Sequence, residues 1–401
     1  MHTPLRHIPS LFSRKRPIHL TFFVTRRCNA RCPFCFYAGP RDALGGAPEL
    51  SLDEIRRVTR SMDALLWVIF SGGEVFLRED LVEVSQLFHD TNRAAFLTYP
   101  TNGSLPEVIA ERTEEILRRC RDSVVVVKLS LDGIGEDHDS LRQTPGGFDR
   151  LLRAHRMLAR LTEGYPRLEL GINTLFCAEN QWRMEGIVDF VRGLDGVRSH
   201  TITMVRGPSR EGGSGSVDLG HYRRVALHLE KRWSCGQRRY HRFAGSRLKA
   251  AQDRLQRQLI RQTLLHRRRL IPCYAGRLNL VLSESGDLYP CEERWDSSFG
   301  NVREAGYDVK AMLRSERGTR IRDEMARGEC YCSHECNFLT NILFNPLMHP
   351  RLIGSYARVR LGLAEKKDAS MGRWQGRPTA TAGEMAVMAS ATQGAGGGCD
   401  G

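Results

Sequence analysis

The chain has 401 residues, of which 41% are hydrophobic and 26% are charged, and its formal net charge is +14. This length is enough for one large domain, a smaller domain and a sizeable buried core, and the composition is ordinary for a globular protein. No apolar run reaches the roughly 18 residues of a membrane-spanning helix. The basic segment Met1–Pro17 lacks the apolar core and cleavage site of a secretory signal, so we expect a cytoplasmic protein.

Short apolar runs and longer helical patterns alternate from His19 to Met204. The expected strands are 19–24, 66–70, 94–98, 123–131, 167–175 and 197–204, and the expected helices are 52–62, 80–89, 106–119, 148–161 and 182–192. Such alternation indicates an α/β fold with a parallel sheet or barrel. Six units are too few for the usual eightfold barrel, so we predict an open partial (β/α)6 barrel over residues 19–206. The chemistry of such folds lies at the C-terminal ends of the strands.

The remaining segments differ in composition. Residues 1–18 form a basic N-terminal extension, and residues 207–270 form a basic helical insert that is crowded with arginine between 221 and 270. This insert is interpreted either as a solvated helical face or as a clamp for an anionic partner, such as a nucleic acid or an anionic lipid surface. We expect a C-terminal helix over 346–368 and a disordered Gly/Ala/Thr/Ser-rich tail over 369–401.

The twelve cysteines point to metal binding, because disulfides are rare in a reducing cytosol. Eight of them form two groups, and the other four are scattered and are expected to be buried structural thiols. The first group is Cys28, Cys32 and Cys35. The second group is Cys273, Cys291, Cys330, Cys332 and Cys336. The scattered ones are Cys120, Cys177, Cys235 and Cys399.

The first group follows the first expected strand. Three closely spaced thiolates bind three irons of a [4Fe–4S] cluster and leave the fourth iron without a protein ligand. An open coordination position is where a metal meets its substrate. A closed zinc site is the alternative, but it needs a fourth ligand and none lies nearby in the sequence.

This CxxxCxxC pattern resembles the signature of the radical S-adenosylmethionine (SAM) superfamily. The resemblance implies that SAM chelates the open iron and that an electron, from a donor of the flavodoxin or ferredoxin type, cleaves it to a 5′-deoxyadenosyl radical. Phe34, just before the last cysteine, is then expected near the adenine. Gly72, Gly73 and Glu74, directly behind the second strand, resemble the GGE motif that holds the SAM amino group.

Further matches to the family stand at later strand ends. Thr101 and Asn102 correspond to polar groups near the SAM methionine, and Ser130 and Asp132 to the segment that binds the ribose. Arg142 matches an arginine that pairs with the SAM carboxylate, a role that suits a planar guanidinium, although a surface ion pair is the alternative. The remaining candidates are adenosine or adenine contacts, with strand-end capping or core packing as the alternative: Asn173, Thr174, Met204 and Val205.

The second group predicts an auxiliary cluster. Cys273 and Cys291 flank an expected hairpin, and the stretch 286–291 resembles the Gly-x4-Cys element of the SPASM and twitch extensions of radical SAM enzymes. A full SPASM domain needs more cysteines than remain. We therefore expect a SPASM/twitch-like domain over 271–345 with one auxiliary [4Fe–4S] cluster, held by Cys273, Cys291 and two or three of the last three cysteines. A zinc site that includes His334 is the alternative.

The resemblance defines the first half of the reaction and leaves the substrate open. The first hypothesis is hydrogen abstraction from a small anionic metabolite, such as a sugar or nucleoside, that leads to dehydrogenation, epimerisation or decarboxylation. An epimerase needs a hydrogen donor on the opposite face, for which Cys177 and Cys235 are candidates. The second hypothesis is modification of a peptide, with a separate leader-binding protein. The third is binding of nucleic acid or anionic lipid through the arginine-rich segment.

Overall fold

The computed structural model describes residues 2–37, 47–206, 217–234, 243, 245–328 and 330–361. Two of the scattered cysteines, Cys235 and Cys399, lie outside the described residues. The expected tail over 369–401 also lies outside them, as does the end of the expected C-terminal helix after residue 361. Its described part is the helix α13 (His349–Leu361).

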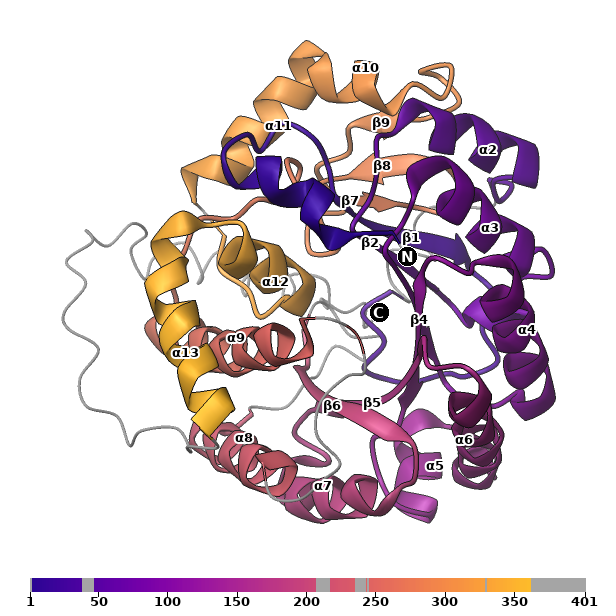
Figure 1. Ribbon diagram of the computed structural model, residues 1–401, viewed down its shortest axis with the longest axis vertical. Coiled ribbons are helices and arrows are strands. Elements are labelled where there is room, and N and C mark those ends of the chain that lie inside the picture. Colours follow the sequence, from indigo (N-terminus) through magenta and orange to yellow (C-terminus); the bar gives the residue numbers. More distant parts are fainter. Residues whose placement is uncertain are drawn as a thin grey trace, which may run out of the picture. The chain divides into compact units, whose positions relative to one another are not determined.

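The six expected strands are present as a parallel sheet. They are β1 (His19–Thr25), β2 (Trp67–Gly72), β3 (Phe96–Thr101), β4 (Val124–Ser130), β5 (Leu168–Phe176) and β6 (Val197–Met204), and they lie side by side in chain order. Every residue of β1 is buried, because a strand lies on each side of β1 and other residues cover both faces of the sheet there. The predicted partial barrel is therefore confirmed (Figure 1).

Helices cover the outer face of these strands. They are α2 (Leu52–Ser61), α3 (Leu81–Asn92), α4 (Pro106–Arg119), α6 (Gly147–Gly164) and α7 (Met184–Gly193). The short helix α5 (Glu136–Arg142) contacts α6, and there are short 3-10 turns η1 (Pro4–Leu11), η2 (Val75–Leu77) and η3 (Gln181–Arg183). A capping box starts α2, because the Ser51 side chain accepts from the Glu54 amide and the Glu54 side chain accepts from Ser51. The short helix α5 is absent from the sequence-based expectations.

The cysteine-rich part continues the same sheet. Strand β7 (Asn279–Leu282) pairs in parallel with β1, and β8 (Asp287–Tyr289) and β9 (Gly300–Asn301) follow in antiparallel order. The β7–β8 turn contains Gly286 at φ 96°, a conformation that favours glycine. The helices α10 (Val309–Arg314), α11 (Glu316–Arg327) and α12 (Glu335–Leu343) and the turn η4 (Pro346–Met348) complete this part. The expected hairpin is therefore present, and it extends the sheet of the barrel.

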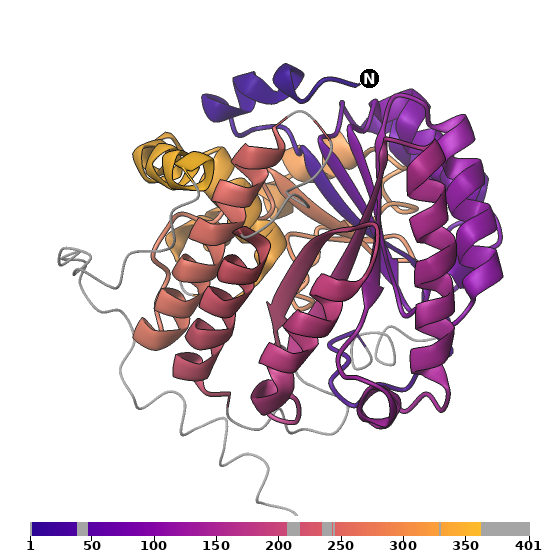
Figure 2. The same cartoon turned by 60° about the horizontal axis from the view of Figure 1, so that its bottom comes forward.

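The arginine-rich segment forms two helices, α8 (Leu219–Ser234) and α9 (Ser246–His266), which stand beside the open edge of the barrel in Figure 2. One face of α9 is apolar and buried with Phe338 and Ile342 of α12. Arg254 and Arg257 both pair with Glu230 of α8, at 3.0 and 3.1 Å. Part of the arginine density therefore serves internal packing rather than an external partner.

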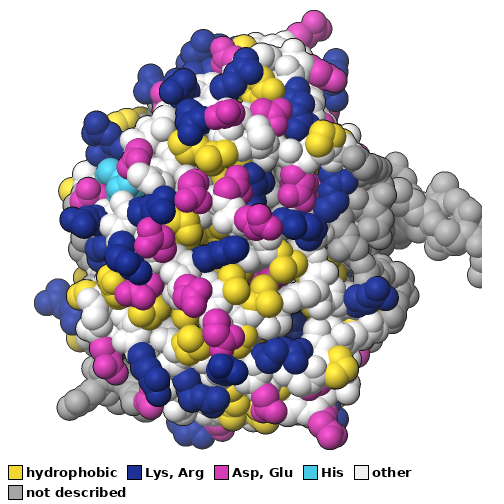
Figure 3. All heavy atoms as spheres, turned by 90° about the vertical axis from the view of Figure 1, so that its right-hand side faces the viewer, with side chains coloured by type: hydrophobic (Ala, Val, Ile, Leu, Met, Phe, Trp, Pro, Cys, Tyr) yellow, Lys and Arg dark blue, Asp and Glu magenta, His cyan; other side chains and the backbone are white. Residues whose placement is uncertain are grey.

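Basic and acidic side chains are interspersed on the face that carries α2, α3 and α4 (Figure 3). The net positive charge is consequently not gathered into a single-sign patch on that face. Within the described residues, no helix is both long enough and apolar enough to cross a membrane.

Candidate active site

A cavity of about 330 Å³ lies inside the barrel and reaches the C-terminal ends of its strands. All three cysteines of the first group line it, together with every residue of the predicted SAM site except two. The lining residues of that prediction are Cys28, Cys32, Phe34, Cys35, Gly72, Gly73, Glu74, Thr101, Asn102, Ser130, Asp132, Arg142, Asn173 and Met204. Of the two exceptions, Thr174 is buried and donates to Leu131 O, and Val205 lines a neighbouring cavity.

The GGE segment packs directly against the cysteine loop. The amides of Gly73 and Glu74 donate to the carbonyl oxygens of Thr25 and Arg27, each at 2.8 Å. A Cβ atom at Gly73 would lie 2.0 Å from the Arg27 oxygen, so a side chain there would push the two segments apart. Glycine is needed because only a bare backbone allows this approach, and the approach brings Glu74 beside the cysteines.

Glu74 is a buried hydrogen-bond acceptor. Thr101 Oγ1 donates to its Oε1 at 2.7 Å, the Asn102 amide donates to its Oε2 at 2.8 Å, and the Phe76 amide donates to Oε1 at 3.2 Å. Burial raises the pKa of Glu74, although these hydrogen bonds favour the charged form. The sequence placed Glu74 and Thr101 in the same site, and the structure brings them into contact.

Asp132 and Arg142, predicted to bind different groups of SAM, form an ion pair with each other. Arg142 Nη1 lies 2.6 Å from Asp132 Oδ2, and the side chains are only 12% and 2% exposed. The amide of Leu175 donates to the other oxygen of Asp132 at 2.7 Å. Arg142 is therefore not a surface ion-pair residue. Its carbonyl oxygen also lies 3.7 Å from Cys32 Sγ, which places it beside the first cysteine group.

The opposite wall of the cavity carries charged residues that the sequence analysis missed. Arg206, two residues after β6, pairs with Glu292, Glu293 and Glu335 at 2.9, 3.1 and 2.8 Å. His334 Nε2 lies 3.0 Å from the same Glu292 oxygen. Despite burial, the neighbouring His334 and Arg206 lower the pKa of Glu292 to about 2. The available signal was position, since Glu292 directly follows one cysteine of the second group and Glu335 directly precedes another.

The five cysteines of the second group divide by their surroundings into a set of four and a separate one, Cys336. Cys273 lies within electrostatic range of Cys291, Cys330 and Cys332. Burial raises the pKa of Cys332 to about 12. Cys336 instead has Glu292, Arg206, Glu335 and Lys128 as its strongest electrostatic neighbours. It lines the barrel cavity, whereas Cys273, Cys330 and Cys332 line a separate small one.

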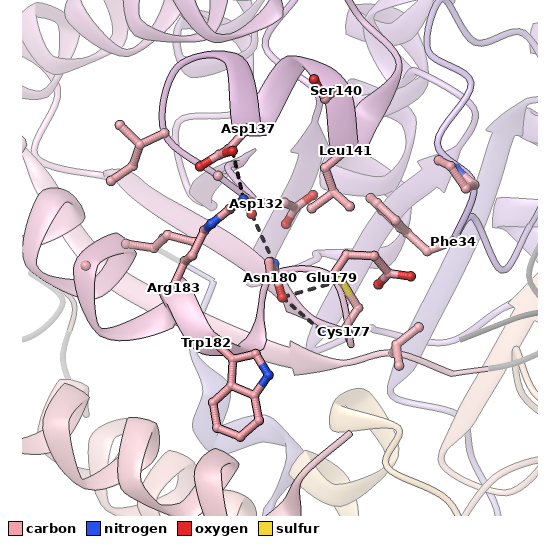
Figure 4. A pocket seen from close by; sticks show the side chains of 16 residues that line it. Phe34, Asp132, Asp137, Ser140, Leu141, Cys177, Glu179, Asn180, Trp182 and Arg183 are labelled. Carbon is pink, nitrogen blue, oxygen red and sulfur yellow. Dashed lines mark hydrogen bonds and ion pairs between the residues drawn. The ribbon is translucent and has the colours of Figure 1, made fainter. Parts of the chain in front are cut away.

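A larger cavity of about 730 Å³ adjoins the first and shares Phe34 and Asp132 with it (Figure 4). Cys177, a candidate hydrogen donor, lies in its wall and contacts Asn180 Oδ1 at 3.4 Å. Trp182, which is 62% exposed, and the Arg183–Asp137 ion pair lie at another part of the wall. Cys177 therefore does not line the cavity that holds the first cysteine group.

Comparison with known proteins shows to which family this arrangement belongs. Residues 22–191 match the model of the radical SAM superfamily, and residues 273–337 match the model of the SPASM iron–sulfur cluster-binding domain. The chain belongs to the radical SAM superfamily. This radical SAM protein therefore binds a [4Fe–4S] cluster and SAM, and its SPASM domain binds auxiliary iron–sulfur.

Individual relatives are distant. Over 297 residues the protein is 24% identical to the antilisterial bacteriocin subtilosin biosynthesis protein AlbA of Bacillus subtilis, a match that covers 73% of this chain but only 59% of AlbA. It is 24% identical to the AdoMet-dependent heme synthase of Methanosarcina barkeri, over 78% of this chain and 87% of the synthase. It is 28% identical to the PqqA peptide cyclase of Rhodopseudomonas palustris, over 45% of each chain.

A solved structure shares the fold. The structure of native anSMEcpe with bound AdoMet superimposes with a TM-score of 0.53 and 17% identity, over 86% of this chain and 100% of that one. At this identity the likeness establishes the fold alone.

The donor sets fit the cofactors of the family. Three thiols open onto a cavity of sufficient size for a cluster with a free iron, next to the Glu74 carboxylate. Burial raises the pKa of Cys273, Cys291 and Cys332, so their thiolates would be costly without a metal to neutralise them. Iron in a cluster supplies that neutralisation.

Proposed function

We propose that this radical SAM enzyme carries out a net oxidation of a peptide substrate inside the barrel. SAM at the open iron would supply a 5′-deoxyadenosyl radical that removes a hydrogen atom, and Cys28, Cys32 and Cys35 would hold that cluster. Cys273, Cys291, Cys330 and Cys332 would hold the auxiliary cluster. Four thiolates leave no open iron for a substrate, which suits electron transfer.

One observation carries this proposal: a residue adjacent to the second cysteine group in the chain forms part of the wall of the cavity that the first cysteine group lines. Cys28 lines the cavity from the barrel side, and Glu292, which directly follows Cys291, lines it from the SPASM side. Arg206 ties the two sides together through Glu292 and Glu335. A substrate radical formed in this cavity would therefore lie between a site that generates radicals and a site that can accept the remaining electron.

The peptide class is supported by the PqqA peptide cyclase, whose name states such a role, and by AlbA, whose name states a role in bacteriocin biosynthesis. The test is anaerobic reconstitution with SAM, a reductant and short peptides encoded beside the gene. We expect 5′-deoxyadenosine together with a peptide that has lost two hydrogen atoms, as measured by mass spectrometry. Turnover that returns the peptide with unchanged mass but inverted stereochemistry would contradict net oxidation.

A second candidate is a small anionic metabolite. The AdoMet-dependent heme synthase matches over the largest share of its own length among the three relatives above, and the barrel contains the cations Lys128 and Arg206. Stoichiometric 5′-deoxyadenosine with carboxylated metabolites, and none with peptides, would favour this candidate over the first.

A further inference from the structure

Lys128 is a cation inside the barrel that the predicted cofactor sites do not use. It lies on β4, two residues before Ser130, and its side chain lines the same cavity as the first cysteine group. Among the described residues, its ammonium donates a hydrogen bond to Thr201 Oγ1 at 2.8 Å and forms no ion pair. Burial, followed by the nearby Lys249, lowers the pKa of Lys128 to about 8. Lys128 is half-buried, and a partly desolvated charge without a counter-ion is costly, so an anion beside it would be stabilising.

The acidic groups around Lys128 are engaged elsewhere. Glu335 pairs with Arg206 at 2.8 Å, and Asp253 pairs with Lys249 on α9. The Cys336 thiol is also close, and burial raises its pKa, which disfavours the thiolate. The position beside Lys128 and Thr201 is thus the place in this cavity where an incoming anion would meet a cation not already paired.

A second chamber of about 230 Å³ begins at Lys128. It shares six lining residues with the first cavity: Ile69, Thr98, Lys128, Thr201, Glu335 and Cys336. Beyond them its wall is largely apolar, with Trp67 and Phe96 from the starts of β2 and β3 and Leu339 and Leu343 from α12. An apolar cavity of about 150 Å³ is large enough to bind benzene. This chamber therefore has room for a larger group, such as a bicyclic aromatic ring.

We propose that the barrel selects a substrate in which a carboxylate adjoins an apolar, ring-sized group. The carboxylate binds at Lys128 and Thr201, the apolar group occupies the chamber beyond them, and the rest of the substrate faces the first cysteine group. This rests on the proposed function only in taking the barrel as the substrate site. The same chemistry is offered by a free carboxylic acid and by the C-terminal residue of a peptide.

The test measures binding rather than turnover. The reconstituted holoenzyme with SAM is titrated against 5-fluoroindole-3-acetate and the neutral 5-fluoroindole-3-acetamide, with ¹⁹F NMR as the readout. A second pair of probes is a short peptide that ends in 5-fluorotryptophan, either as the free acid or as the amide. In at least one pair we expect the acid to bind about tenfold more tightly than the amide, since the neutral amide still accepts a hydrogen bond from Lys128 but lacks the negative charge that strengthens it. The pair that shows the preference identifies the source.

Variants test which residues cause the preference for the acid over the amide. Lys128→Met should abolish the difference between acid and amide, while Lys128→Arg should retain it and shows that the fold tolerates a change here. Lys310→Met, at a lysine that is paired with Asp63 and lines neither cavity, is the control and should keep the preference. Leu248→Trp, at the 42% exposed rim of the chamber, should weaken acid and amide alike.

Two results would overturn the inference: no preference for the acid in either pair, including no binding at all, or a preference that survives Lys128→Met. Neither result bears on whether SAM is cleaved or the substrate oxidised. Conversely, acid-selective binding without any oxidised product would contradict the proposed function but would still support this substrate site.

Discussion

Arg206 and Glu292 join the two sides of the candidate active site, with Nη2 and Oε2 2.9 Å apart. Arg206 lies two residues after the barrel strand β6, and Glu292 directly follows Cys291 of the SPASM domain. The Arg206 side chain is 13% exposed and that of Glu292 is 5% exposed, and both line the cavity that contains the first cysteine group. Through Glu292, the SPASM domain therefore contributes to one wall of the cavity.

The division of the second cysteine group predicts the iron content of variants. The reconstituted protein should hold about eight irons per chain in two [4Fe–4S] clusters, and Cys336→Ser should retain them. Cys332→Ser should lose about four, because it removes one of the four grouped thiols. Iron analysis and Mössbauer spectroscopy check this. Loss of four irons in Cys336→Ser would show that this cysteine is a ligand after all.

Glu74 should be required for SAM binding. Glu74→Gln keeps the shape but loses the charge that would hold an ammonium, so SAM affinity should fall about tenfold or more, as for a lost hydrogen bond to a charged group. Isothermal titration calorimetry on the reconstituted protein measures it. Glu79→Gln, five residues away and exposed, is the control and should bind SAM normally. Equal affinity of the two variants would remove Glu74 from the site.

The Arg142–Asp132 pair should be a strong determinant of stability. Arg142→Met leaves the 2% exposed Asp132 charge without its partner, a change that costs about 3–5 kcal/mol in the free energy of unfolding. Arg183→Met breaks a pair whose side chains are 61% and 47% exposed, and should cost less than about 1 kcal/mol. Urea unfolding compares the two. Similar losses in both variants would contradict the importance of burial.

Glu54 should make stability depend on acid pH. It joins α2 to the SPASM domain, because Arg303 Nε and Tyr307 Oη lie 2.6 and 2.9 Å from its Oε1. The hydrogen bond from Arg303 lowers the pKa of Glu54 from 4.5 to about 2. A lowered pKa contributes stability above the unfolded value of 4.5, and this contribution is lost as pH falls toward 2.

Glu54→Gln should therefore destabilise the protein at pH 7, by on the order of 2 kcal/mol. The difference in melting temperature from wild type should shrink as pH falls below about 4.5. Glu304→Gln, at an exposed glutamate in the same region, should show no such trend. A difference that stays constant from pH 7 to pH 3 would show that Glu54 acts through packing rather than charge.

Local patterns were sufficient for the strands, most helices and the first metal site. The alternation of short apolar runs with helical patterns revealed β1 to β6. Each of these strands packs against its neighbours and therefore carries apolar residues that the sequence shows. Cys28 was identified from its spacing to Cys32 and Cys35, whereas Glu74 and Asp132 were expected from the family resemblance. The fold brings the three together because the ends of parallel strands meet at one edge of a sheet. The short helix α5 was missed because its seven residues, Glu136–Arg142, include only one buried side chain.

The second site needed the tertiary structure. The sequence by itself determined that five late cysteines imply an auxiliary cluster, and it left open which of Cys330, Cys332 and Cys336 belongs to it. Spacing alone could not separate them, because the direction of each side chain depends on how α12 packs against the barrel. That packing turns Cys336 toward the cavity and, with it, brings Arg206, Glu292 and Lys128 from distant parts of the chain to one place. Contacts between residues so far apart in sequence leave no periodic pattern, so only the folded chain reveals them.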